Sequence, residues 1–303
     1  MKLAALVVLL VPSLLLAEES ETTFVSVPTP DAESITIYQP MGKLALNGWD
    51  KREVRVVAHK RAKDGKALDQ LRVEFEMLDG KILIRAGVRI GKTFRALPAS
   101  EAASIDLTID APRKVTLRAQ TFGGDIDASG FRSGAQLSSS GGEVHAWDID
   151  GEVHTEALSG KQRLSAIRGN VEAEGVTGDV ELDAIDGELL QASVVDGQIV
   201  ARRIRTPVVR LFSSSGGVVL MGTTRPGGRY ELTARQGDVK LILSRASFTV
   251  NARAPGGSVK NDFVLTHAVG SPTTLRGEYM GGGPQLELTA AHGNIIIEAA
   301  SAQ

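Results

Sequence analysis

The chain has 303 residues, of which 42% are hydrophobic but only 4% aromatic, so its core must be built mostly from Val, Ile, Leu and Ala. Lys and Arg total 34 against 36 Asp and Glu, which gives a net charge of -2. We see no strongly basic segment and expect no nucleic-acid partner, because that affinity depends on cationic side chains facing phosphates. The sequence has no cysteine, which excludes disulfides, thiolate metal sites and a cysteine nucleophile.

The first residues, MKLAALVVLLVPSLLLAEES, have the pattern of an export signal. Lys2 supplies the positive end, Leu3 to Leu16 form the apolar stretch, and Ala17 ends a predicted signal peptide at residues 1–17. The apolar run is short and interrupted by a Pro-Ser pair, which disfavours a spanning helix. We therefore expect an exported protein with no membrane span in its mature chain, whether periplasmic, cell-surface or extracellular. An uncleaved anchor stays open.

Two segments precede the regular part of the sequence. Residues 18–34 are polar, contain two prolines and are predicted to be a linker or a loose lead-in segment. Residues 35–120 alternate apolar and polar side chains, as in EVRVVAHK, LRVEFEML and SIDLTID, with turn sequences such as NGWD and KDGK between them. This period-two pattern predicts an N-terminal β-strand region that packs on, or leads into, the regular part.

From residue 121 to residue 300 the chain repeats a glycine-led unit every nine or ten residues. Glycine tolerates a positive φ and the close approach of a second backbone, so it suits the sharp turn that begins each unit. The glycines that we predict to mark these turns are Gly124, Gly142, Gly151, Gly160, Gly169, Gly178, Gly187, Gly197, Gly217, Gly237 and Gly257.

The third, fifth and eighth positions of each unit are mainly apolar, and we expect all three to face a core. The eighth position holds Ile149, Leu158, Ile167, Val176, Ile185 and Val194. One unit cannot bury so small an apolar face alone, but stacked copies can, because each covers the side chains and pairs with the backbone of its neighbour. The predicted fold is therefore an all-β, parallel β-solenoid with two units, about 19 residues, per coil.

Several segments together resemble a known family. GKLALNGWDKREVRVVAHK has the family's strand, turn and strand, and IDLTIDAPRKVTLRAQTFGGDIDASG enters the repeats through Pro112 and the step from Gly124 to Ile126. The GEV, GDV and GNI units come next. Over roughly residues 40–300 the chain is similar to the bacterial β-strand-repeat family known as "putative adhesin", a domain of unknown function. The resemblance implies a cell-envelope module and brings no catalytic residue with it.

Calcium binding and polysaccharide cleavage are two kinds of chemistry that a repeat of this length could support. Calcium β-rolls also repeat every nine residues, but here the residue after glycine varies among Asp, Glu, Lys, Asn and Gln, so we expect no metal site and no cofactor. Acid pairs such as Glu181 and Asp183 could act as general acid and base, but they alternate with core positions, and we interpret them as solvated. Stacking would place Arg163 near Glu181 and Asp183 near Arg202. We expect no catalytic residue.

The candidate contact residues are two tryptophans. Trp147 occupies an outward column and Trp49 follows Gly48 in a turn, so each could meet a partner or be covered by the protein itself. The sequence thus predicts an exported, non-enzymatic structural or binding module whose partner is an envelope protein or a surface polysaccharide. A carbohydrate-active β-helical enzyme and a surface protein that self-associates through its end strands are the alternatives.

Overall fold

The computed structural model describes residues 19–91, 93–95, 103–244 and 247–300, so the predicted signal peptide lies outside the described residues. No helix within these described ranges is long and apolar enough to cross a membrane. The chain divides into two compact units, Met1–Asp150 and Gly151–Gln303. The first unit therefore contains the initial glycine-led repeats as well as the N-terminal β region.

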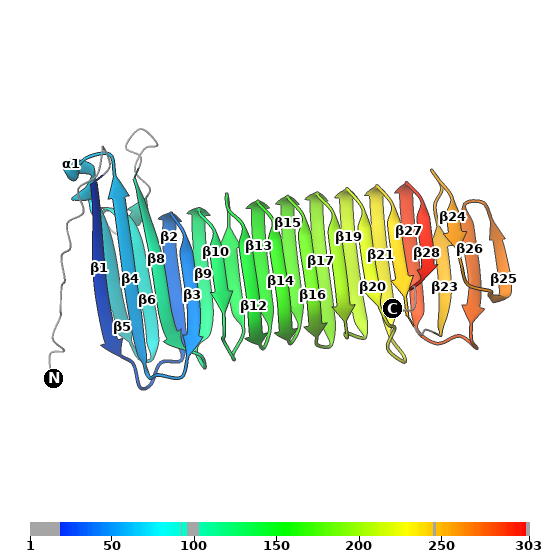
Figure 1. Ribbon diagram of the computed structural model, residues 1–303, viewed down its shortest axis with the longest axis horizontal. Helices are drawn as coiled ribbons and strands as arrows, with labels where there is room; N and C mark the ends of the chain where they lie inside the picture. Colours follow the sequence, from blue (N-terminus) through cyan, green and yellow to red (C-terminus); the bar gives the residue numbers. More distant parts are fainter. Residues whose placement is uncertain (1–18, 92, 96–102, 245–246, 301–303) are drawn as a thin grey trace. The chain divides into compact units, whose positions relative to one another are not determined.

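The first unit consists of strands and a single helical turn (Figure 1). These are β1 (Glu19–Pro28), β2 (Ser34–Met41), β3 (Leu44–Trp49), β4 (Glu53–Ala62), α1 (Gly65–Leu68), β5 (Leu71–Leu78), β6 (Lys81–Ile90), β7 (Thr93–Arg95), β8 (Ser104–Pro112), β9 (Thr116–Gly123), β10 (Ile126–Ser129), β11 (Ala135–Ser139) and β12 (Val144–Asp150). Sheet 1A has the order β1-β4-β8-β3-β10-β12, and sheet 1B has the order β5-β6-β2-β9-β11 with β7 beside β6.

Pairing in this unit changes from antiparallel to parallel along each sheet. Strands β1, β4, β5 and β7 pair antiparallel with their neighbours, whereas β2, β3, β9, β10, β11 and β12 pair in parallel. The coil made by β2 and β3 lies between β6 and β9 in one sheet and between β8 and β10 in the other. An early segment of the chain is therefore inserted between later ones.

Residues 19–28 were expected to be part of a linker, but they form β1. This strand pairs antiparallel with β4 along its whole length, from Glu19 opposite Ala62 to Pro28 opposite Glu53. In its TFVSV segment, side chains point alternately to the two faces of the sheet. The backbone of β4 supplies the hydrogen-bond partners. These residues are thus an edge strand rather than a loose segment.

The second unit continues the repeats as short strands. These are β13 (Val153–Ser159), β14 (Gln162–Arg168), β15 (Val171–Thr177), β16 (Val180–Asp186), β17 (Leu189–Asp196), β18 (Ile199–Ile204), β19 (Val208–Ser215), β20 (Val218–Gly222), β21 (Arg229–Gln236), β22 (Val239–Leu243), β23 (Phe248–Arg253), β24 (Val259–Asn261), β25 (Thr266–Ser271), β26 (Thr274–Tyr279), β27 (Gln285–His292) and β28 (Ile295–Ala299). Sheet 2A has the order β14-β16-β18-β20-β22-β28-β24, and sheet 2B has the order β13-β15-β17-β19-β21-β27-β23-β26-β25.

Strand register in sheet 2B gives the length of each coil. Val153 pairs with Val171, Val171 pairs with Leu190, and Leu190 pairs with Val209. Val209 then pairs with Tyr230, which is a slightly longer step. All these pairs are parallel, and successive partners recur about every 19 residues, which confirms the predicted all-β solenoid and its coil length.

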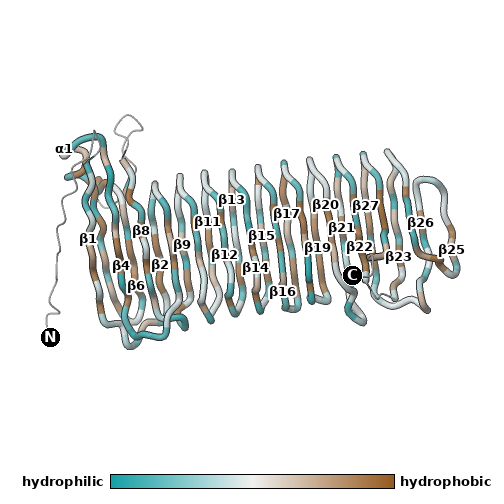
Figure 2. The backbone as a smooth tube through the Cα atoms, in the orientation of Figure 1, coloured by the Kyte–Doolittle hydropathy of each residue, from teal (hydrophilic) through white to brown (hydrophobic). Residues whose placement is uncertain are grey.

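The core lies between the two sheets of each unit, and hydrophobic and hydrophilic residues alternate along the strands (Figure 2). The prediction that every eighth position faces the core is wrong for two of the six units, those with Leu158 and Val176. In β14 and β16, Ile167 and Ile185 are fully buried, because the residues before them, Ala166 and Ala184, have φ of 52° and 55° and reverse the alternation.

Strands β13 and β15 of sheet 2B keep their regular alternation, so the eighth position points outward in these two strands. Leu158 and Val176 are 58% and 44% exposed, whereas Ala157 at the seventh position is buried. In β17 one extra residue moves the pattern along, so that Val194 is buried and Val195 is 53% exposed. Leu158, Val176 and Val195 therefore form an exposed aliphatic row across three neighbouring strands.

The last coil in the sequence is not the last coil in the stack. Strand β27 lies between β21 and β23, and β28 lies between β22 and β24. In space, Gly293 lies between Gly237 and Gly257. Beyond β23, the antiparallel strands β26 and β25 end sheet 2B.

Candidate functional site

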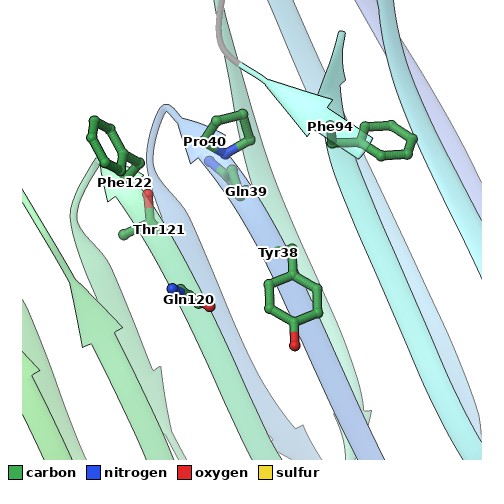
Figure 3. A pocket seen from close by; sticks show the side chains of 7 residues that line it. All are labelled: Tyr38, Gln39, Pro40, Phe94, Gln120, Thr121 and Phe122. Atoms are coloured by element: carbon green, nitrogen blue, oxygen red, sulfur yellow. The ribbon is translucent and has the colours of Figure 1, made fainter. Parts of the chain in front are cut away.

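A cavity of about 220 Å³ opens on the outer side of sheet 1B, where strands β2 and β9 end beside β7. Three aromatic side chains, Tyr38, Phe94 and Phe122, surround it together with Pro40 (Figure 3). Tyr38 is 40% exposed and Phe122 is 73% exposed, although large apolar side chains normally lie in the core. We call this site the aromatic pocket.

Strand register brings the lining residues together from distant parts of the sequence. Tyr38 lies opposite Gln120, and Gln39 lies opposite Thr121, in the parallel pair of β2 and β9. Since side chains alternate along a strand, Tyr38 and Gln120 point outward while Gln39 and Thr121 point into the unit. The lining of the pocket therefore combines outward aromatic rings with buried polar groups.

The buried polar groups have unused hydrogen-bonding capacity. Gln39 and Thr121 are each 2% exposed. The Gln39 side-chain amide donates to the backbone oxygen of Ile105 at 2.7 Å, but its Oε1 atom has no hydrogen-bond partner among the described residues, and neither has the Thr121 hydroxyl. A buried polar atom without a partner costs about 1–3 kcal/mol, and both atoms lie on the inward face of the sheet.

Charge near the pocket is already balanced. The Arg85 guanidinium lies 5.5 Å from the centroid of the Phe94 ring and forms ion pairs with Glu74 and Glu76 on β5. The described lining residues are Tyr, Gln, Pro, Phe and Thr, with no carboxylate or imidazole among them. The pocket therefore offers apolar faces and neutral hydrogen-bonding groups, and it suits an uncharged ligand with hydroxyl groups.

A sequence profile of the Toastrack DUF4097 family matches residues 7–298, nearly the whole chain. The chain belongs to this family. The β-strand-repeat resemblance, which rested on the glycine-led units and their N-terminal strands, is confirmed by this match. No curated protein gives a significant sequence match to this Toastrack chain.

Three solved structures are similar to the Toastrack chain. A "putative cell adhesion protein" from Clostridium sporogenes is 11% identical, with 93% of this chain and 100% of that chain covered and a TM-score of 0.25. A "putative lipid binding protein" from Parabacteroides distasonis is 11% identical, covering 91% and 96%, with a TM-score of 0.45. A "putative adhesin" from Bacteroides fragilis is 10% identical, covering 91% and 96%, with a TM-score of 0.42. The family assignment rests on the sequence profile alone.

Neither tryptophan that the sequence singled out lines the aromatic pocket. Trp49 is half-buried at the end of β3, where its indole N–H donates to the backbone oxygen of Glu53 at 2.9 Å. Lys51 and Arg55 cover its ring at 4.7 and 5.0 Å from the centroid. Trp49 is therefore held by the turn in which it lies, and its indole contributes to the local structure.

Trp147 is also half-buried, on the outer face of β12. Its ring stacks on that of His145, with centroids 4.4 Å apart and an interplanar angle of 29°. Nδ1 of His145 lies 3.6 Å from a carboxylate oxygen of Asp127, which also forms an ion pair with Lys43 at 2.7 Å. The hydrogen bond and negative charge of Asp127 raise the pKa of Lys43. Polar groups thus surround this stack.

The predicted turn glycines lie in columns along the edges of each Toastrack unit. In each pair a Cβ on the first residue would lie 1.9–2.4 Å from the carbonyl oxygen of the second: Gly124 on Gly42, Gly142 on Gly124, Gly169 on Gly151, Gly178 on Gly160, Gly187 on Gly169, Gly197 on Gly178, Gly216 on Gly197, Gly237 on Gly216, Gly293 on Gly237 and Gly257 on Gly293. The column passes through Gly216, whose φ is 146°, and not through the predicted Gly217.

The predicted charge pairs across neighbouring coils are partly correct. Arg163 lies opposite Glu181 and pairs with it at 3.4 Å. Arg202 lies opposite Asp183 in the register, but it is Arg203 that donates to Asp183, at 2.7 Å from its Nε atom. Arg203 has a φ of 52°, and this left-handed turn in the backbone brings its side chain to the carboxylate. Among the described residues, no group of three His, Asp or Glu side chains could hold a metal ion.

Sequence reasoning missed the aromatic pocket because its rings come from three separate strands. Tyr38 and Phe122 lie far apart in the sequence, and Phe94 comes from a short strand between them. A usable signal did exist. In a chain with 4% aromatic residues, ITIYQ and RAQTF each place a ring at an outward position of an alternating strand.

Proposed function

We propose that this Toastrack protein is an exported, non-enzymatic envelope module that binds a neutral surface polysaccharide at the aromatic pocket. The observation that carries the proposal is the grouping of exposed aromatic side chains around one cavity. Tyr38 is 40% exposed and Phe122 is 73% exposed, and both line this one cavity. The signal-like sequence of residues 1–17 supports export.

The chemistry of the pocket fits a sugar ring. An aromatic face packs against the C–H groups on one side of a pyranose, and neutral amide and hydroxyl groups exchange hydrogen bonds with its hydroxyls. Gln120 and the Tyr38 hydroxyl offer such groups at the surface. A charged ligand would gain less, because Arg85 is already paired with Glu74 and Glu76.

A binding role, rather than catalysis, is consistent with the composition of the site. Glycoside hydrolysis needs two carboxyl groups on either side of the scissile bond, and none of the described lining residues carries one. The nearby carboxylates on β5 are engaged by Arg85. The described lining can hold a saccharide but has no group positioned to protonate a leaving oxygen.

The test is isothermal titration of the protein from residue 18 onward against neutral polysaccharides and their oligosaccharides, including dextran and cello-oligosaccharides. Tyr38→Ala and Phe122→Ala should each weaken binding about tenfold, since each removes a ring contact worth about 1 kcal/mol or more. Phe24→Ala is the matched control, because Phe24 is also 40% exposed and in the same unit but lies on β1. It should change affinity less than twofold.

Three outcomes would overturn the proposal. The first is no binding of any neutral glycan by the unmodified protein. The second is an equal loss of affinity in Phe24→Ala and in the pocket variants, because this would indicate general hydrophobic adhesion. The third is cleavage of a bound glycan, which would replace the binding role with the enzymatic alternative.

A further inference from the structure

A second cavity, of about 600 Å³, lies on one edge of the second unit. It lies along four successive turns that each lead from sheet 2A to sheet 2B, after β14, β16, β18 and β20. Its described lining residues are Arg168, Gly169, Asp186, Gly187, Glu188, Arg205, Pro207, Arg225 and Pro226. We call this site the arginine cleft.

The cleft is shaped by a loop that folds back over the edge. The turn after β20 runs from residue 223 to residue 228 and is longer than the turns after β14 and β16. Within it, the Arg225 side chain donates from Nε to the backbone oxygen of Arg205 at 3.0 Å, one coil away. Its Nη2 atom lies 3.8 Å from Asp186, two coils away. The Arg225 side chain is thus directed along the edge, with 46% of it exposed.

A buried tyrosine fixes the base of this loop. The Tyr230 hydroxyl accepts a hydrogen bond from the Arg225 backbone N–H at 2.7 Å and donates to the backbone oxygen of Thr206 at 3.4 Å. Tyr230 is 2% exposed, and its burial raises the pKa of the phenol, so the hydroxyl keeps its proton. Pro207 and Pro226 restrict φ on both sides of the cleft. The position of the Arg225 guanidinium is therefore built into the fold.

The described lining of the cleft holds three arginines and two carboxylates, a small cationic excess that the near-neutral net charge conceals. Between residues 202 and 235 the chain has seven arginines and one acidic residue, so the sequence-based expectation of no basic segment is wrong for this stretch. No acidic side chain of the described residues forms an ion pair with Arg205, and Arg225 has only its long contact with Asp186. Two arginines that line one cleft and have so few ion pairs favour an added anion.

We infer that the arginine cleft binds the carboxylate of an acidic polysaccharide. A guanidinium fork matches a planar carboxylate, and Arg205 and Arg225 both line the cleft. Asp186 and Glu188 would repel a polyphosphate, but they accept hydrogen bonds from the hydroxyls that accompany each carboxylate in a uronic acid. The described lining has no aromatic ring for a nucleobase and no large aliphatic group for a lipid chain. This site is independent of the aromatic pocket.

The test is titration of polygalacturonate into the protein at low and physiological salt, with dextran as the uncharged polymer. Arg205→Gln and Arg225→Gln should each weaken binding about tenfold, because each removes a charge-assisted hydrogen bond. Arg253→Gln is the matched control: it removes the same charge from an exposed position at the end of β23. Asp186→Asn with Glu188→Gln should strengthen polyphosphate binding more than polygalacturonate binding, because it removes repulsion for both polymers but weakens the acceptors for the sugar hydroxyls. Unchanged thermal unfolding of the variants shows that the fold is intact.

If Arg253→Gln weakened polygalacturonate binding as much as the cleft variants do, the binding would be non-specific charge attraction. The proposed site would then be wrong. Tighter binding of single-stranded DNA or of anionic lipid vesicles than of polygalacturonate, with the same dependence on Arg205 and Arg225, would overturn the ligand class. Tyr38→Ala should leave polygalacturonate binding unchanged. The two sites can therefore fail separately.

Discussion

Gly142 lies directly against the backbone of Gly124, one coil earlier in the first unit. A Cβ atom on Gly142 would be 2.2 Å from the carbonyl oxygen and 2.3 Å from the carbonyl carbon of Gly124. Neither glycine has φ in the left-handed region, so close approach of two backbones, and not backbone conformation, demands glycine here. The same contact recurs along each edge and explains why the repeat begins with this residue.

Gly142→Ala should therefore destabilise the first unit by about 3 kcal/mol, since one methyl group must force two stacked backbones apart. Gly123→Ala is the control, because a Cβ there would meet its nearest atoms at 3.7 and 3.8 Å, which is ordinary contact. That control should cost less than about 0.5 kcal/mol. Urea denaturation followed by circular dichroism measures both. Equal losses would mean that glycine is required for flexibility and not for close approach.

The glycine period reveals the solenoid because each coil meets the same backbone constraint at its corner. The period does not reveal which neighbouring residue takes the corner, as the column at Gly216 rather than Gly217 shows. Nor does it reveal that Ala166 and Ala184 adopt a positive φ and turn the next residue inward, since alanine has no preference for that region. The repeat was therefore enough to predict the fold class. It was not enough to predict which residues at the end of each strand face the core.

Long-range pairing sets a second limit on what the sequence reveals. The insertion of β2 and β3 at one end of the sequence, and of β27 and β28 at the other, depends on pairings between segments far apart along the chain. The aromatic pocket has the same origin, since Tyr38 and Phe122 meet only because β2 pairs with β9. A periodic pattern predicts which residues of successive repeats are neighbours. It does not predict where the order of coils in the stack differs from their order in the sequence.

A buried polar pair bridges the two sheets of the second unit. The Thr155 hydroxyl donates to Oε1 of Gln162 at 2.6 Å, and the Gln162 amide donates to the backbone oxygen of Glu174 at 2.7 Å. Gln162→Leu should cost about 1–3 kcal/mol, because it leaves the Thr155 hydroxyl buried without a partner. Adding Thr155→Val should recover part of that loss. A double-mutant cycle by urea denaturation gives the coupling, and strictly additive losses would contradict it.

His154 should make the stability of the second unit depend on pH. Burial lowers its pKa, but hydrogen bonds and negative charge from Glu156, at 3.1 Å, and Glu172, at 3.2 Å, raise the pKa overall above the ordinary 6.5. The folded state thus binds the proton more tightly than the unfolded state. The contribution of protonated His154 to the free energy of unfolding is complete below the pKa of the unfolded state. It is lost as pH rises through the higher pKa of the folded state.

The expected result is a modest fall in unfolding free energy as pH rises above 6.5, of about 1 kcal/mol or less because both carboxylates are substantially exposed. His154→Gln should remove this dependence. Denaturation curves from pH 5.5 to 9 would measure the difference between the two proteins. A difference that does not change with pH would show that His154 does not titrate in this range.

Removal of the inserted C-terminal coil, β27 and β28, tests whether these strands stabilise β23, β24 and β26. Leu286 and Leu288 on β27 are each 1% exposed, and Leu286 pairs with Tyr230 on one side and Val250 on the other. Truncation after Gly283 removes β27 and β28, so β23 loses its parallel partner. Hydrogen exchange should then show loss of protection in β23, β24 and β26 but retention in β13 to β19, because contacts in a solenoid are between neighbours.

Truncation after Ala300 is the matched control and should leave the exchange pattern unchanged, since β27 and β28 remain. A different outcome of the truncation after Gly283 is that the remaining strands close up along the glycine column. Gly257 stacks on Gly293, and Gly293 stacks on Gly237, so Gly257 already has the geometry needed to stack on Gly237 directly. If β23 and β24 kept full protection after truncation at Gly283, they would have closed onto β21 and β22. The inserted coil would then be a replaceable layer and not the support of the C-terminal strands.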